Sequence, residues 1–151
     1  AYDMPILTFV DNEGVEVSAC HKAMRALAKL AYAYAEAGSP MVSVLTGKAI
    51  GEGYAAMSNK GNGADLVYAL PQAKIGCMSA EAGSIVLFGG TTEAAADYAE
   101  AYLSAESAAK QGVVDDIVAP EHIRETIIAA LLTATDKREQ KPNRKHGIMP
   151  L

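Results

Sequence analysis

The sequence predicts an α/β fold in a single domain that spans residues 1–151. Short apolar, β-branched segments are each followed by a turn of small residues and then by a helical pattern, and this succession occurs three times. Such alternation is typical of a sheet covered by helices. The chain has 151 residues, of which 50% are hydrophobic and 21% charged, and is long enough to bury one core.

Composition and charge exclude several classes of protein. The formal net charge is -5 and no basic cluster precedes the C-terminal tail, so we expect no nucleic-acid partner. No apolar run is long enough to span a membrane, and the first residues have no signal-peptide pattern. Cys20 and Cys77 form no Cys-x-x-Cys pair, which favours two reduced thiols in a cytoplasmic protein and leaves a disulfide open.

The chain begins with a strand and a long helix. Residues 6–10 are apolar and predict a buried strand, which the turn residues 11–14 follow. Ser18 is expected to cap a helix that runs to Ala37 and carries its apolar residues on one face. Because the chain opens almost directly on a buried type of strand, we expect a fragment, a split subunit or a trimmed chain.

The next stretch contains the first candidate site. Residues 41–46 predict a buried strand that Gly47 and Lys48 end, and a glycine-containing turn at 51–53 then leads into a helix over 54–59. A strand that turns through glycines into a helix leaves backbone N–H groups unpaired, and these can hold a phosphate or an oxyanion. The alternative is a tight turn that only brings strand and helix close together. No Lys-Ser or Lys-Thr follows the glycines, so this is not a nucleotide-binding phosphate loop.

The rest of the chain is expected to alternate in the same way. The predicted strands cover 65–70, 74–78 and 113–118. One predicted helix follows the turn at 79–83, two more cover 93–103 and 104–111, and the last begins at Pro120.

Few side chains suggest chemistry by themselves. Glu52 is a candidate general acid or base if the fold buries it, and otherwise a solvated carboxylate that stabilises a helix start. Glu81 stands in a similar place and has the same alternative. Cys20 and His21 are adjacent on a predicted helix and therefore point apart, so we do not expect a nucleophile and base pair. The sequence has no cluster of zinc-ligand type, and we expect no metal.

Five motifs stand in the same order as in one known family. They are Met-Pro-Ile-Leu-Thr-Phe-Val-Asp at 4–11, Ala-Lys-Leu-Ala-Tyr-Ala-Tyr-Ala-Glu-Ala at 28–37, the segments 48–60 and 63–78, and Lys-His-Gly-Ile-Met-Pro-Leu at 145–151. Together they resemble the C-terminal half of the biotin-dependent acyl-CoA carboxyltransferases. That family includes the β subunits of propionyl-CoA and methylcrotonyl-CoA carboxylases and related acyl-CoA decarboxylases.

The resemblance implies a crotonase-type fold of repeated β-β-α units and an active site shared between two halves. In the family, the N-terminal half of one protomer binds the acyl-CoA and the C-terminal half of another receives biotin from a separate carrier protein. Backbone N–H groups at a Gly-Gly-Ala turn stabilise the enolate oxygen of biotin. On matching positions Glu52 and Gly53 are the donors, and the other expected binding residues are Gly51, Tyr54, Ser79, Ala80, Glu81, Ala82 and Gly83.

The implied partners are therefore an acyl-CoA-binding N-terminal-half subunit and a biotin carrier protein, in a homo- or hetero-oligomer. The chain departs from the family pattern at Glu52, where the family has Gly, and at Ala55, where it has Asp. A carboxylate at position 52 repels a developing oxyanion unless it is protonated or turned away. Two alternatives stay open: a non-catalytic crotonase-fold assembly subunit, and a stand-alone crotonase-type acyl-CoA hydratase or hydrolase that uses Glu52 as its acid or base.

Overall fold

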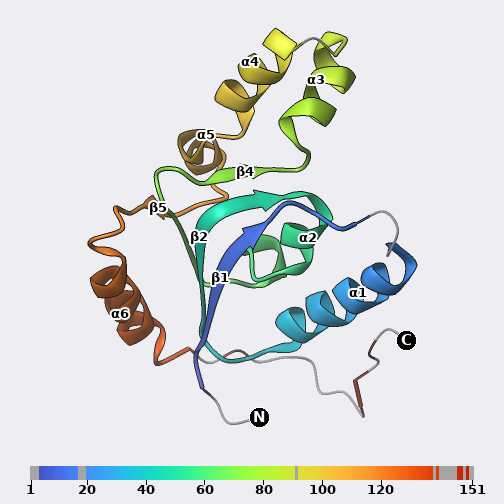
Figure 1. Cartoon of the computed structure of the whole chain (residues 1–151). Helices are drawn as coiled ribbons and strands as arrows, with labels where there is room; N and C mark the ends of the chain where they lie inside the picture. The colour runs from blue at the N-terminus through green and yellow to red at the C-terminus, as the bar shows by residue number, and fades with distance from the viewer. Residues whose placement is uncertain are drawn as a thin grey trace.

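The computed structural model describes residues 4–16, 20–90, 92–137, 139, 146, 147 and 149. A five-stranded sheet forms the centre, and all of its strand pairings are parallel (Figure 1). The strands are β1 (Ile6–Asn12), β2 (Met41–Ile50), β3 (Leu66–Ala69), β4 (Lys74–Gly76) and β5 (Asp116–Ile117). The helices are α1 (Cys20–Glu36), α2 (Gly51–Ala56), α3 (Ala80–Phe88), α4 (Thr92–Tyr102), α5 (Ala105–Lys110) and α6 (Ile123–Ala134), with a short 3-10 helix, η2 (Lys60–Asn62).

These elements follow the predicted order, and their bounds differ at a few ends. The last helix begins at Ile123, because the residues from Pro120 onward form a turn before it. The expected cap at Ser18 lies outside the described residues. Among the helices that the structure describes, none is long and apolar enough to cross a membrane.

Strand β2 is the central strand and changes partners along its length. Its first half pairs with β1 and β3, from Ile6 opposite Met41 to Leu45 opposite Ala69. Its second half pairs with β4, and this pairing ends with Ile50 opposite Gly76. The residues of β2 that lie between β1 and β3, 41–45, are all buried, as expected for a strand covered on both faces.

The prediction that Gly47 and Lys48 end this strand is wrong, because β2 continues to Ile50. The carboxylate of Asp11 accepts the backbone N–H of Lys48 at 2.8 Å and lies directly over Gly47. A Cβ atom at Gly47 would lie 2.4 Å from Asp11 Oδ1, so glycine here makes room for the carboxylate and does not break the strand.

Helix α2 also begins earlier than predicted, at Gly51 instead of Tyr54. Gly51 has a φ angle of +67°, a left-handed conformation that glycine adopts readily, and the chain therefore turns from strand to helix within one residue. At the other end, the side-chain amide of Asn59 donates to the carbonyl oxygens of Tyr54 and Ala55, both at 3.0 Å. These bonds satisfy carbonyl groups that a helix end leaves free.

The core lies on both faces of the sheet. One cluster includes Val10, Leu45 and Val67 and continues to Ala105 and Ala108 of α5. The other cluster joins Val42 and Tyr68 to Ala130 of α6 on the opposite face. Figure 1 shows α6 on one side of the sheet and α1 and α2 on the other, while α3 and α4 form a hairpin that extends beyond β4.

Two carboxylates hold the beginnings of the central strands. Asp65 accepts the backbone N–H of Met41 at 2.8 Å, and Asp115 accepts that of Val67 at 2.8 Å. Asp115 also pairs with Lys60, with 2.6 Å between Oδ2 and Nζ. Each carboxylate thus satisfies a strand N–H from a neighbouring segment, which fixes the register of the parallel strands.

We predict that Asp115→Ala lowers the free energy of unfolding by about 1–3 kcal/mol, because it leaves the Val67 N–H without its acceptor. It also removes the charged partner of Lys60, whose ammonium keeps its hydrogen bond to the carbonyl oxygen of Asp65. Urea denaturation followed by circular dichroism measures the loss. The matched control is Glu121→Ala, which removes an exposed carboxylate from the turn before α6. Equal midpoints for the two variants would contradict the role given to Asp115.

Candidate functional site

The ends of β2 and β4 bring two turns together. Because Ile50 pairs with Gly76, the residues that follow each strand, Gly51 and Cys77, leave the sheet side by side. A methyl group on Gly51 would lie 3.8 Å from the carbonyl oxygen of Cys77. The first turn of α2, whose backbone N–H groups have no partner within the helix, therefore begins next to the exit of β4.

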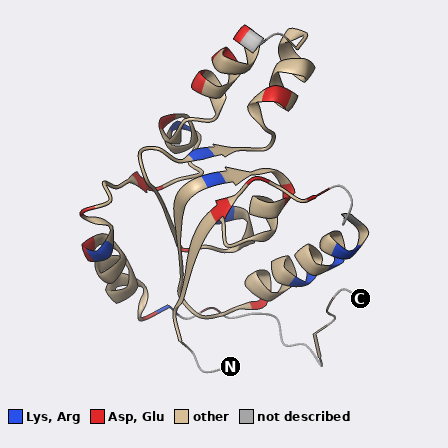
Figure 2. Cartoon of the chain, in the orientation of Figure 1, with Lys and Arg blue, Asp and Glu red and all other residues tan. Residues whose placement is uncertain are grey.

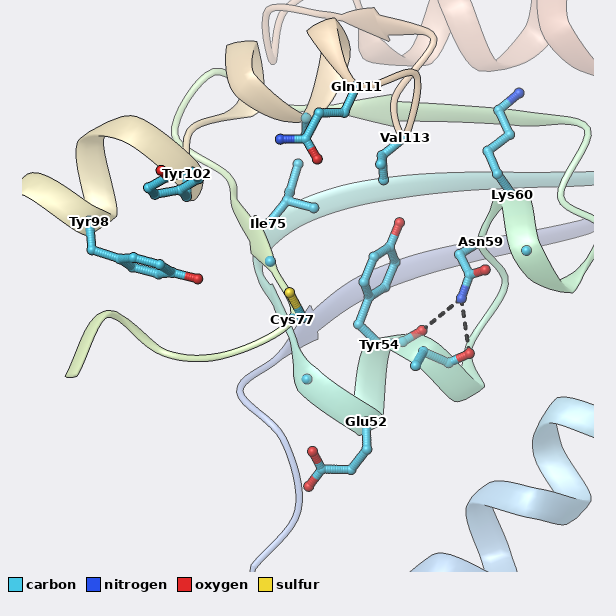
Figure 3. A pocket seen from close by; sticks show the side chains of 15 residues that line it. Glu52, Tyr54, Asn59, Lys60, Ile75, Cys77, Tyr98, Tyr102, Gln111 and Val113 are labelled. Carbon is cyan, nitrogen blue, oxygen red and sulfur yellow. Dashed lines mark hydrogen bonds between the residues drawn. The ribbon is translucent and has the colours of Figure 1, made fainter. Parts of the chain in front are cut away.

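A cavity of about 610 Å³ opens at this place. Its lining comes from α2 and the segment after it, from β4, and from α4, α5 and the loop before β5 (Figure 3). The lining residues are Gly51, Glu52, Tyr54, Ala55, Asn59, Lys60, Gly61, Ile75, Gly76, Cys77, Tyr98, Tyr102, Ala108, Gln111 and Val113. The volume is that of a site for a small organic group.

The side chain of Tyr54 occupies the middle of this cavity. Figure 3 shows its ring standing up from α2 with the hydroxyl group directed toward Val113. Only 8% of Tyr54 is exposed, and its buried hydroxyl has no hydrogen-bond partner among the described residues. Burial raises the pKa of Tyr54 to about 12, so the hydroxyl is a neutral donor at physiological pH. An unpaired buried polar group of this kind costs about 1–3 kcal/mol of stability.

The two charged side chains in the lining both have partners elsewhere. Glu52 is exposed, accepts the backbone N–H of Val15 at 3.2 Å and points away from Tyr54 (Figure 3). Lys60 pairs with Asp115, as described above. The inner part of the cavity is therefore neutral. Because Glu52 is exposed, the burial that a general acid or base role required of it is not met.

Gly53 is buried behind the turn and has a close neighbour. A Cβ atom at Gly53 would lie 1.9 Å from Oδ1 of Asn12, which itself accepts the backbone N–H of Gly14 at 2.8 Å. The side chain of Asn12 thus fills the space that the family's Ala would need. Of the two expected N–H donors, Glu52 lines the cavity and Gly53 lies just behind it.

The second turn that was expected to bind a ligand, residues 79–83, lies outside the lining of the cavity. Ser79 accepts the backbone N–H of Ala82 at 3.3 Å and caps α3. Its neighbour Glu81 is exposed, and hydrogen bonds from its own backbone N–H and from Ser79, together with Lys48 and Lys74, hold the pKa of its carboxyl below the usual range. The lining of the cavity includes none of Ser79, Ala80, Glu81, Ala82 and Gly83. Their role in binding stays a prediction.

Gly83 instead supports one wall of the cavity. A Cβ atom there would lie 2.4 Å from the ring of Tyr98, so glycine lets α3 and α4 approach closely. Tyr98 and Tyr102 lie four residues apart on α4, with ring centroids 5.1 Å from each other. This wall was not predicted, although two tyrosines at helical spacing in an alanine-rich helix indicate that they share one aromatic face.

Within the part of the chain that the structure describes, no three His, Cys, Asp or Glu side chains are grouped to hold a metal ion.

Residues 1–149 match the model of the carboxyl transferase domain. The chain is 38% identical to a putative propionyl-CoA carboxylase beta chain of Bacillus subtilis, over 100% of this chain and 32% of that protein. It is 40% identical to the mitochondrial propionyl-CoA carboxylase beta chain of Homo sapiens, over 100% of this chain and 29% of that protein.

Solved structures show the same relationship. The chain superimposes on transcarboxylase 12S with a TM-score of 0.92 and 36% identity, covering 99% of this chain and 31% of that one. The beta subunit of geranyl-CoA carboxylase from P. aeruginosa has a TM-score of 0.76 at 18% identity, and the match covers 97% of this chain and 32% of that one. At this identity it supports the fold alone. The predicted resemblance and the crotonase-type α/β fold are confirmed. The chain spans about a third of the length of these relatives.

The contact between Gly53 and Asn12 can be tested directly. We predict that Gly53→Ala lowers the free energy of unfolding by about 1–3 kcal/mol, because the new methyl group forces Asn12 to move. In an Asn12→Ala background the same change should cost less than half as much. Gly38→Ala is the control, since no atom lies within 4 Å of its added Cβ. An equal cost in both backgrounds would show that the strain has another source.

Proposed function

The chain belongs to the carboxyl transferase family, and on that premise we propose that it is the biotin-side half of an acyl-CoA carboxyltransferase. The observation that carries the proposal is the first turn of α2 at the edge of a neutral cavity, next to the end of β4. Backbone N–H groups fixed at such a place stabilise negative charge that develops on a bound oxygen.

The cavity suits the ring of biotin. Its lining includes the apolar residues Ile75, Ala108 and Val113, the first turn of α2 lies at its edge, and the hydroxyl of Tyr54 is unpaired. Biotin is neutral at its ureido ring and supplies the carboxyl group, which it carries on a ring nitrogen. The N–H groups of Glu52 and Gly53 are proposed to hold the ureido oxygen, and the apolar wall to exclude water.

The carboxylate of Glu52 is compatible with this role because of its direction. It accepts the N–H of Val15 outside the cavity, so the main chain of residue 52 can serve the site while the side chain faces the loop. Repulsion of an anion in the cavity is then weak, since the separation is larger and water screens the charge.

The other half of the enzyme is proposed to come from a partner. Helix α3 exposes four consecutive apolar side chains, Ile85 (67%), Val86 (68%), Leu87 (54%) and Phe88 (50%). A helix that is apolar on all sides is normally buried. Because the chain spans only about a third of its relatives, we propose that an acyl-CoA-binding half covers α3 in an oligomer that a biotin carrier protein visits.

The deciding experiment is purification of the tagged chain from its native lysate, followed by identification of the bound proteins and an assay of carboxyl transfer. We expect an acyl-CoA-binding chain and a biotinylated carrier in an active complex. Self-association with neither protein would contradict the proposal and favour the structural subunit.

We predict that Val86→Asp on α3 reduces recovery of the acyl-CoA-binding half at least tenfold, because a charge on an apolar interface is costly to desolvate. The melting temperature of the chain alone should stay within about 2 °C, since Val86 is exposed. The control is Glu93→Lys on α4, a charge change at an exposed position of the neighbouring helix. Undiminished recovery with Val86→Asp would place the partner elsewhere.

Glu52→Gly tests the site itself. In the active complex we expect the rate of carboxyl transfer to be kept or raised by about two- to tenfold, because a nearby negative charge is removed and the backbone N–H remains. Glu52→Gln should behave alike and controls for the flexibility that glycine adds. Loss of activity in both variants would instead favour the stand-alone enzyme that uses Glu52 as its acid or base.

A further inference from the structure

The hydroxyl of Tyr54 is one of two buried side-chain polar atoms without a hydrogen-bond partner in the described part of the chain, and the other is Oγ of Ser58. The Tyr54 hydroxyl is buried in the middle of the cavity, and Figure 3 shows it pointing away from α2 toward Val113. Most buried polar groups in folded proteins are paired. A phenylalanine at this position would fill the same space without an unsatisfied group, so packing alone does not account for the hydroxyl.

Nothing near the hydroxyl serves as a built-in acceptor. Ile75 and Val113 lie on either side of it and are apolar (Figure 3). Oδ1 of Asn59 already accepts the backbone N–H of Asn62 at 3.1 Å. Gln111 donates through Nε2 to the hydroxyl oxygen of Ser107 at 3.4 Å, and its Oε1 makes no hydrogen bond with Tyr54. Among the described residues the hydroxyl therefore has no acceptor, and a bound molecule can supply one.

The charge of the cavity restricts what that molecule can be. Lys60 is paired with Asp115 and Glu52 faces the outer loop, so the inner wall offers no cation to a carboxylate or a phosphate. A neutral carbonyl oxygen can accept from a phenol in apolar surroundings without such help. The hydroxyl is thus matched to a neutral acceptor and not to an anion.

We propose that the Tyr54 hydroxyl determines ligand specificity by donating a hydrogen bond to a neutral carbonyl oxygen inside the cavity. The inference deepens the proposed function and rests on it for the identity of the ligand. Two sources offer this chemistry: the ureido carbonyl of biotin and the thioester carbonyl of an acyl-CoA. The hydroxyl remains unpaired in the empty chain and gains its partner on binding.

The test compares Tyr54→Phe with Tyr68→Phe in the full-length chain. Both residues are 8% exposed, but the lining of the cavity does not include Tyr68. The probes are biotin methyl ester and propionyl-CoA, titrated by isothermal calorimetry, and melting temperature is measured without ligand.

We expect Tyr54→Phe to weaken binding of one probe about tenfold, the value of one lost neutral hydrogen bond. The empty protein should melt at the same temperature or about 2–4 °C higher, because an unsatisfied group has been removed. Tyr68→Phe should change binding less than about twofold, because its hydroxyl does not reach the cavity. If the Tyr54 hydroxyl served only the fold, Tyr54→Phe would lower the melting temperature and leave the affinity for both probes unchanged.

The outcomes separate this inference from the proposed function. Binding of biotin methyl ester that Tyr54→Phe leaves unchanged overturns the inference while the biotin-side function stands. Binding of propionyl-CoA alone, weakened by Tyr54→Phe, supports the inference and overturns the assignment to biotin. Failure of the unsubstituted chain to bind either probe at millimolar concentration overturns both.

Discussion

The architecture depends on the change of partners along β2. The first half of this strand is buried between β1 and β3, and its second half pairs with β4, with one further pairing to β1 at Ala49. Asp11 marks the transition, because its carboxylate lies over Gly47 and accepts the N–H of Lys48. The extension of β2 beyond this point carries α2 to the end of β4. Without it, the two turns that form the edge of the cavity would lie on different parts of the sheet.

The same contacts control the electrostatics of the cavity. Lys48 pairs with Glu13 outside it, Lys60 pairs with Asp115 beside it, and Glu52 is held by the N–H of Val15. These three charged side chains thus have partners within the chain. A neutral, poorly hydrated interior strengthens the hydrogen bonds that backbone N–H groups and a phenol can offer, because water does not compete for them. Carboxyl transfer, in which negative charge moves between neutral carriers, is favoured by such surroundings.

The sequence predicted the order of the elements because each has a local signal, such as the β-branched run at 41–46 or the Ser79 cap of α3. It did not predict the length of β2, since the carboxylate over Gly47 and the new partner at β4 are distant in the chain. The wall made by Tyr98 and Tyr102 was missed for the same reason, because tertiary packing alone brings α4 to α2. The glycines at 51 and 53 predicted a change from strand to helix, but helix α2 already begins at Gly51, and the direction of the Glu52 side chain required coordinates.

Two features of the chain are unfavourable in isolation and have a common explanation. The apolar side chains of α3 are exposed to water, and the hydroxyl of Tyr54 is buried without a partner. Each lowers the stability of the separate chain, and in the proposed assembly each is relieved by binding, the first by a protein surface and the second by a carbonyl oxygen. Ligands and partners that bind only the folded state stabilise it by mass action. The proposed assembly and the proposed occupation of the cavity therefore act in the same direction, because both remove a cost that folding alone leaves in place.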